Sequence, residues 1–418
     1  MTSASRAVEA VWRIEAARIV ATLARFTGDF GLAEDAAQEA FAAALAQWPV
    51  EGVPRNPGAW LTTTAKRRAV DAFRRRERLD QRTAILAREL EDTAEAAWDP
   101  DTIDDDVLRL ILIACHPVLG REAQLALTLR VVGGLSSEQI AHAFLVPVGT
   151  VQQRIVRAKK TLAAAAAPFE VPPREEWQAR LAAVLQVLYL IFNEGHSASA
   201  GPDWLRVDLA GEGLRLARML AELVPDEPEA LGLVALLELT AARFPARLAP
   251  DGSPILLADQ DRARWDRTLI ARGRQALARA DRLGRGRGPY GLQAAIAECH
   301  AVAASVTTTD WERIVLLYEA LGQVAPSPVV ELNRAVAVSM ATGPANALRI
   351  VDDLVADGRL AGYHLLPSVR GELLTRLGRP AEARDEFEQA IRLTGNERER
   401  TVLQAKLDAL GPRTAPDR

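Results

Sequence analysis

The stretch GLSSEQIAHAFLVPVGTVQQRIVRAKKTL, residues 134–162, has the pattern of two short helices joined by a tight turn. Ser136 and Gln139 have the spacing of a capping box, which marks the start of a helix, and Pro147 prevents that helix from continuing. Apolar residues recur at helical spacing in the second half and are expected to pack inward: Val151, Ile155, Ala158 and Leu162. The pattern predicts a helix–turn–helix.

The outward face of the second helix carries polar and basic residues and no acid from 149 to 160. Its stripe contains Gln153, Val156, Arg157 and Lys160, and it is flanked by Gln152 and Lys159. In a major groove, Gln pairs with adenine, Arg pairs with guanine and Lys contacts phosphate. A solvated amphipathic helix is the alternative interpretation. The capping box, the short turn and the lack of acids favour DNA binding.

A second basic helix is predicted at 58–78, GAWLTTTAKRRAVDAFRRRER. Its apolar stripe consists of Leu61, Ala65, Ala69, Ala72 and Phe73. Arg67, Asp71 and Arg74 lie on the far side with Arg75 beside them, and Asp71 can bridge to Arg67 or Arg75 at a spacing of four. Such a face can hold phosphates and touch exposed bases, although a charged helix taken alone is more often simply solvated.

Charge is distributed unevenly along the 418 residues, although the net charge is only −4. Residues 66–78 hold seven Lys or Arg and two acids, whereas residues 89–106 hold nine acids and no base. Basic patches separated by an acidic, solvated connector are therefore expected. The predicted organisation is a domain at 1–85, an acidic linker at 86–105, a second domain at 106–170 and a helical array at 171–418.

Several functional classes are disfavoured. The two cysteines cannot form a disulfide framework, so a reducing cytoplasm is expected, and no signal peptide or membrane span is predicted. No phosphate loop, zincin motif or nucleophile elbow is present, so we expect neither an enzyme nor a cofactor. Cys115–His116 and Cys299–His300 do not make metal sites, because adjacent helical residues point about 100° apart.

The C-terminal array shows weak internal repetition. GRPAEARDEFEQAIRL, residues 378–393, has the second-helix pattern of a tetratricopeptide repeat, formed by Ala383, Phe387 and Ala390. The same spacing recurs 69 residues earlier, about two repeats away, at Ile314, Tyr318 and Leu321. We assign no repeats to residues 174–285. Within that part, the segment LYLIFNEGHSAS, residues 188–199, interrupts an apolar helix with the polar residues Asn193, Glu194 and His196. These residues could make a regulatory contact, or they could form the polar end of a helix that terminates at Gly195.

Together, three segments up to about residue 166 resemble an extracytoplasmic-function (ECF) sigma factor. AEDAAQEAFAAALAQWP, residues 33–49, resembles the region 2 segment that binds the β′ clamp of core RNA polymerase. Residues 58–78 resemble the following part, which melts and reads the promoter −10 element, and 134–160 resemble the region 4 helix–turn–helix that reads the −35 element. The resemblance implies an all-α fold, with polymerase (β′ clamp and β flap) and promoter DNA as partners.

The resemblance also implies roles for individual residues. The polymerase-binding set is Asp35, Gln38, Glu39 and Phe41; the last lies on the apolar stripe of its helix and is also interpreted as core. The −10 set is Lys66, Arg67, Arg68 and Asp71, to which the basic face adds Arg74 and Arg75. The −35 set is Thr150, Gln152, Gln153, Arg154 and Arg157, to which the outward stripe adds Lys160; Arg154 lies to one side of that stripe.

The remainder of the chain resembles the group of ECF factors that carries a C-terminal, tetratricopeptide-like helical extension. This implies a regulatory region that binds a protein or a small molecule. Two other hypotheses stay open. A stand-alone helix–turn–helix regulator with a helical sensor domain would bind duplex DNA by itself, usually as a dimer. A repeat scaffold with an incidental basic head would show no effect of Gln153 or Arg157 on DNA.

Overall fold

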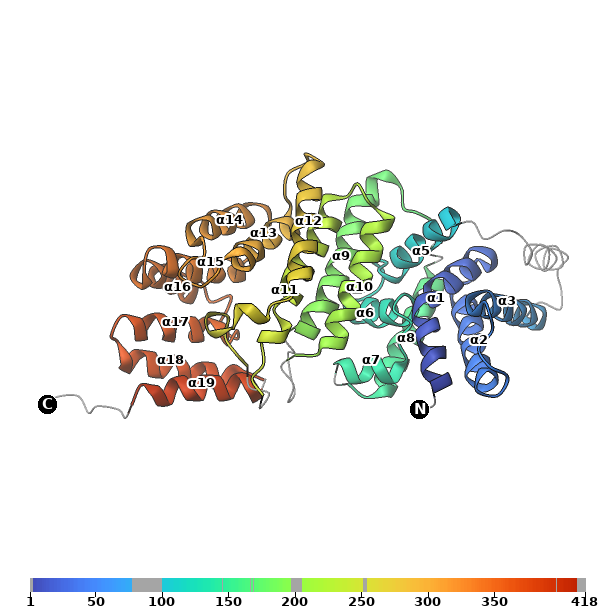
Figure 1. The fold of residues 1–418 in the computed structure, drawn as a ribbon, viewed down its shortest axis with the longest axis horizontal. Helices are drawn as coiled ribbons and strands as arrows, with labels where there is room; N and C mark the ends of the chain where they lie inside the picture. Colours follow the sequence, from blue (N-terminus) through green and yellow to red (C-terminus); the bar gives the residue numbers. More distant parts are fainter. Residues whose placement is uncertain are drawn as a thin grey trace. The chain divides into compact units, whose positions relative to one another are not determined.

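The structure is a computed structural model in which the chain forms two compact units, residues 1–191 and 192–418 (Figure 1). It describes residues 3–76, 100–144, 146–165, 167, 169–196, 205–250, 254–395 and 397–411. These residues form helices and no strand, with one isolated bridge between Leu248 and Pro254. None of the helices in these ranges is both long enough and apolar enough to span a membrane. The all-α prediction is confirmed.

The first part of unit 1 is a group of three packed helices: α1 (Ser3–Thr27), α2 (Phe30–Glu51) and α3 (Pro57–Arg76). α2 begins where Asp29 accepts a hydrogen bond from the backbone N–H of Leu32 at 3.0 Å, which satisfies a donor that the first helical turn leaves open. Trp48, at the end of the apolar stripe of α2, is only 2% exposed. Local capping and one apolar face therefore define this helix.

The second part of unit 1 contains the predicted helix–turn–helix. Its helices are α5 (Pro100–Ala114), α6 (Arg121–Val131), α7 (Ser137–Phe144) and α8 (Val148–Ala164), followed by α9 (Arg174–His196). The capping box is formed as predicted: the Ser136 backbone N–H donates to Gln139 Oε1 at 2.8 Å, and the Gln139 N–H donates to Ser136 Oγ at 3.2 Å. α8 begins at Val148, and its four predicted inward residues are all buried.

The last residues of the predicted acidic linker belong to a helix. Residues 77–99 lie outside the described part of the chain, and α5 begins at Pro100, inside the expected linker. Asp106, at the end of the stretch expected to be solvated, is instead completely buried. Its carboxylate pairs with Arg25 of α1 at 2.9 Å and with Arg109 at 2.6 Å, because a buried charge needs a partner.

Unit 2 is a succession of helices in which chain neighbours pack against each other. After the end of α9 come α10 (Val207–Leu223), α11 (Pro228–Ala241), α12 (Arg267–Arg282), α13 (Pro289–Val302), α14 (Trp311–Val324), α15 (Pro328–Ala341), α16 (Pro344–Asp357), α17 (Leu365–Arg376), α18 (Pro380–Leu393) and α19 (Glu397–Ala409). Three short 3₁₀ helices lie between α11 and α12: η1 (Phe244–Ala246), η2 (Leu257–Asp259) and η3 (Arg262–Arg264).

The residues that suggested a repeat form the core of this array. Ala383, Phe387 and Ala390 of α18 are at most 1% exposed. A Cβ added to Gly371 of α17 would lie 2.9 Å from the Phe387 ring, so the small residue allows α17 and α18 to pack closely. Figure 1 shows α14 to α19 as successive neighbouring helices.

Candidate nucleic-acid interface

The outward face of α8 is free of carboxylates and open to solvent. Gln152, Gln153, Arg157 and Lys160 are exposed, and Val156 between them is 49% exposed. Thr150, in the first turn, is half-buried. Because the opposite stripe is buried, the helix is held rigidly while it presents amide and guanidinium groups outward. This arrangement can read base edges and hold phosphates.

Arg154 differs from the other predicted −35 residues. Its guanidinium forms an ion pair with Glu122 of α6 at 2.6 Å, and its side chain is 29% exposed. The pair ties α8 to α6, next to the apolar stripe rather than on the outward face. Arg154 would therefore have to leave Glu122 before it could contact DNA.

The basic face of α3 is also exposed. Arg67, Arg68 and Asp71 face solvent, whereas Lys66 is half-buried, and burial, followed by the charge of Arg25, lowers the pKa of Lys66. Arg67 and Asp71 form no ion pair with each other within the described residues. Arg74 and Arg75 continue the helix, but their side chains lie outside the described part of the structure.

The predicted polymerase-binding residues lie on α2. Asp35 and Glu39 are exposed and Gln38 is half-buried. Phe41 is half-buried and stacks on Trp12 of α1, with ring centroids 4.8 Å apart. The stacking agrees with the core interpretation of Phe41, since its ring helps join α1 to α2.

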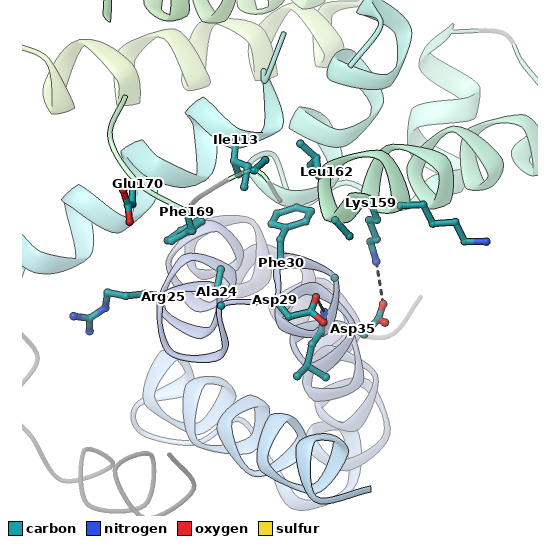
Figure 2. Close-up of a pocket in the computed structure, with 16 residues that line it drawn as sticks. Ala24, Arg25, Asp29, Phe30, Asp35, Ile113, Lys159, Leu162, Phe169 and Glu170 are labelled. Atoms are coloured by element: carbon teal, nitrogen blue, oxygen red, sulfur yellow. Dashed lines mark hydrogen bonds and ion pairs between the residues drawn. The ribbon is translucent and has the colours of Figure 1, made fainter. Parts of the chain in front are cut away.

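A buried ion-pair cluster joins α2 to the helix–turn–helix, and sequence reasoning missed it. Glu34 is only 3% exposed; its carboxylate accepts from Arg130 Nε of α6 at 3.1 Å and contacts Lys159 Nζ of α8. Lys159 also donates to Asp35 Oδ1 at 2.9 Å, as Figure 2 shows. Burial lowers the pKa of Lys159, but Glu34 and Asp35 outweigh that effect and raise it.

A weaker pair links the polymerase-facing residues to the other basic helix. Arg68 Nε of α3 lies 3.7 Å from Glu39 Oε2 of α2, and both side chains are about half exposed. Solvent screening makes such a pair worth little stability. In this arrangement two of the predicted polymerase-facing acids, Asp35 and Glu39, each meet a cation from one of the two basic helices.

A cavity of about 750 Å³ lies beside the Glu34 cluster, between the end of α1 and start of α2 on one side and α5 and α8 on the other (Figure 2). Arg25, Asp35, Lys159 and Lys160 contribute charged groups to its wall, and Phe30 contributes an aromatic ring. The two parts of unit 1 therefore meet both at specific ion pairs and where α1 packs against α5.

The polar segment at the end of α9 is largely occupied by contacts within unit 2. Glu194 pairs with Arg206 at 3.2 Å, and the His196 ring lies against Phe192 and Phe244 with centroids about 6 Å away. Burial, followed by Arg247 and Arg243, lowers the pKa of His196 well below its usual value. Asn193 is exposed. The segment thus builds the α9–α10 contact, and of the three named side chains only Asn193 is fully open to a partner.

The two cysteines are buried. Burial raises the pKa of Cys115 to about 12, and its Sγ lies 3.4 Å from Thr128 Oγ1. Within the described ranges, no three His, Cys, Asp or Glu side chains gather closely enough to hold a metal ion.

Comparison with known families assigns three segments. Residues 13–79 match sigma-70 region 2, residues 109–162 match sigma-70 region 4, and residues 180–281 match a family of unknown function, DUF6596. The first two segments contain the exposed faces of α3 and α8. The third covers the end of α9 and the helices up to α12.

Two relatives extend the comparison. The uncharacterized protein R00370 of Rhizobium meliloti is 45% identical over 407 residues, which cover 94% of this chain and 93% of that protein. The probable ECF RNA polymerase sigma factor SigI of Mycobacterium tuberculosis is 33% identical over 162 residues, which cover 37% of this chain and 54% of that protein. The chain therefore belongs to the same family as the Rhizobium meliloti protein, and it is an ECF-type sigma factor with sigma-70 regions 2 and 4.

Proposed function

We propose that this sigma factor binds core RNA polymerase through α2 and reads both promoter elements with the exposed faces of α3 and α8. The observation that carries the proposal is the face of α8, where Gln152, Gln153 and Arg157 are exposed while the apolar stripe opposite them is buried. Region 4 in this proposal comprises residues 106–170 and region 2 comprises residues 1–85, joined by the acidic segment.

Each part has a distinct task. Asp35, Gln38 and Glu39 bind the β′ clamp, since they leave the apolar stripe of α2. Lys66, Arg67, Arg68 and Asp71, with Arg74 and Arg75, hold the opened −10 strand, while α8 enters the −35 major groove and region 4 rests on the β flap. No bond is made or broken by the factor; it positions the promoter for the polymerase.

The C-terminal region, residues 171–418, regulates this activity in our proposal. Its helix pair α17–α18 has buried small and aromatic residues at tetratricopeptide-like spacing. Stacked helix pairs of that kind present a continuous surface to a protein or ligand. Deleting this region is expected to change the amount of transcript or its dependence on growth conditions.

The test combines a pull-down of core polymerase with transcription in vitro from a pool of promoters randomised at −35 and −10. The wild-type chain should bind core polymerase and enrich a two-part promoter sequence. Arg157→Ala should weaken selection at one −35 position by about 1–3 kcal/mol. Arg154→Ala is the matched control on the same helix: because Arg154 pairs with Glu122, it should have the smaller effect.

The outcomes separate the hypotheses. Enrichment that is the same for wild type and Arg157→Ala would contradict the placement of α8 in the groove. Tight, specific binding of duplex DNA without polymerase would indicate a stand-alone regulator instead of a sigma factor.

A further inference from the structure

Unit 2 contains a cluster of arginines around one tryptophan. Arg243 follows α11, Arg262 begins η3, and Trp265 comes directly after η3. The guanidinium carbon of Arg262 lies 4.8 Å from the Trp265 ring centroid, and that of Arg243 lies 5.9 Å from it. Two cations therefore share the same aromatic ring, which is only 2% exposed.

The partners of these two arginines are uncharged. Arg243 Nε donates to Gln260 Oε1 at 3.3 Å, and Arg262 Nη1 donates to the carbonyl oxygens of His300 and Ala303 at 2.6 and 2.8 Å, where α13 ends. Neither forms an ion pair within the described residues. Elsewhere in unit 2 arginines meet carboxylates, as in the pairs Arg218–Glu238 and Arg274–Glu298.

Further positive charge surrounds the pair. Arg247 is 3% exposed and donates to the His196 carbonyl oxygen at 2.8 Å. Burial, followed by the charge of a neighbouring arginine, lowers the pKa of Arg243 to about 10 and that of Arg247 to about 9. Burying Arg243 and Arg262 beside each other is costly unless a counter-charge compensates for them.

The same cluster contains buried donors without acceptors. Among the described residues, Arg262 Nη2 and Trp265 Nε1 have no hydrogen-bond partner, and neither does the buried His300 Nδ1, which can donate or accept. Such groups are rare in folded proteins, because each one forfeits its hydration. Arg243 and His300 are only half-buried, so these two side chains lie at the solvent-facing edge of the cluster.

We propose that this cluster, formed by Arg243, Arg262 and Trp265 with His300 beside them, binds the oxyanion group of a small molecule, a phosphate or a carboxylate. An oxyanion supplies both the negative charge that the arginines lack and the acceptors that Arg262 Nη2 and Trp265 Nε1 lack. Arg262 is pre-oriented for it, because the carbonyls of α13 hold one arm of its guanidinium fork and leave the other arm open. This inference names the ligand class of the proposed regulatory region.

The test measures thermal unfolding and calorimetric binding of the full chain with inorganic phosphate, with citrate and with sodium chloride at the same ionic strength. Phosphate and citrate also raise the Tm of proteins that do not bind them. Wild type should therefore gain more Tm with one of them than Arg243→Gln does and should show calorimetric binding, and the probe that acts identifies the preferred group. Arg243→Gln should weaken binding at least tenfold. Arg274→Gln, which removes an exposed arginine paired with Glu298, should respond like wild type.

Trp265→Phe gives a second test, because it keeps an aromatic ring but removes the five-membered part of the indole with its Nε1 donor; it should weaken binding several-fold while the chain stays folded. The proposal is overturned if phosphate and citrate change the Tm of wild type only as much as chloride does. It is also overturned if Arg243→Gln binds the probe as tightly as wild type does. Should Arg243→Gln fail to fold, Trp265→Phe decides: unchanged binding overturns the proposal. These readouts involve no polymerase, so they are independent of the proposed sigma activity.

Discussion

His300 is a single residue that makes the stability of the C-terminal region depend on pH. Its ring packs edge-on against Trp311 with centroids 5.2 Å apart. Burial, and then the charges of Arg243 and Arg262, lower the pKa of His300 from 6.5 to about 4. The folded chain therefore keeps this imidazole neutral at pH values where an unfolded chain would protonate it.

The sign of the pH dependence follows from linkage. The unfolded chain binds the proton first as the pH falls, so the contribution of His300 is fully present above about pH 6.5 and is lost as the pH falls toward 4. The loss is at most about 3 kcal/mol, and partial solvent access reduces it. Urea unfolding in chloride buffers from pH 7 to 4 should show a shallower decline for His300→Asn than for wild type. Parallel pH profiles would exclude a low pKa for His300.

At the scale of elements, glycines determine how closely α9 and α10 pack. A Cβ on Gly195 would lie 2.3 Å from the Ala210 backbone nitrogen, and one on Gly213 would lie 2.8 Å from that of Phe192. The obstacle in both cases is backbone, which cannot rotate away. The polar interruption Asn193–His196 thus includes a glycine that the close approach of the two helices requires.

Two substitutions on α10 test this packing. Gly213→Ala should lower the free energy of unfolding by about 1–3 kcal/mol, because the added methyl group forces α9 and α10 apart. Gly211→Ala, on the same helix with nothing within 4 Å, should raise it by up to about 1 kcal/mol through helix propensity. Chemical denaturation of both variants measures the contrast. Equal effects of the two would show that the helices do not approach so closely.

At the scale of the whole molecule, the Glu34 cluster joins region 2 to region 4 within unit 1. Asp35, which we propose to bind polymerase, is held by Lys159 of α8. Binding of the β′ clamp to α2 therefore competes with the contact between the two regions. We expect free factor to favour the closed arrangement of unit 1 and core polymerase to open it.

Energy transfer between dyes on α2 and α8 can follow this opening. Cysteines introduced by Glu51→Cys and Thr161→Cys are accessible, whereas Cys115 and Cys299 are at most 3% exposed. Lys159→Ala should reduce transfer before polymerase is added, because it removes one of the two cations that compensate Glu34, at a cost of about 1–3 kcal/mol.

Lys160→Ala is the control, since Lys160 is the exposed neighbour on the same helix and forms no ion pair among the described residues. It should leave transfer in the free factor unchanged. Transfer that stays high in the Lys159→Ala variant would show that Glu34 does not hold the regions together.

The sequence by itself determined the helices and the outward face of α8. Ser136 and Gln139 cap the start of α7, and the spacing of Val151, Ile155, Ala158 and Leu162 selects the face that is buried. Both signals are local, because capping and helical periodicity act over one or two turns. The same local signals placed the basic face of α3 and the core residues of α18 correctly.

Only the tertiary structure decided which charges meet. Glu34 and Lys159 are 125 residues apart, and the sequence places Arg154 to one side of the outward stripe without showing that it pairs with Glu122. Arg243, Arg262 and Trp265 come together because α11, η3 and the end of α13 converge. A charged side chain has the same sequence pattern whether it faces water, another helix or a ligand, since ion pairing depends on distances that only the packing of remote elements creates.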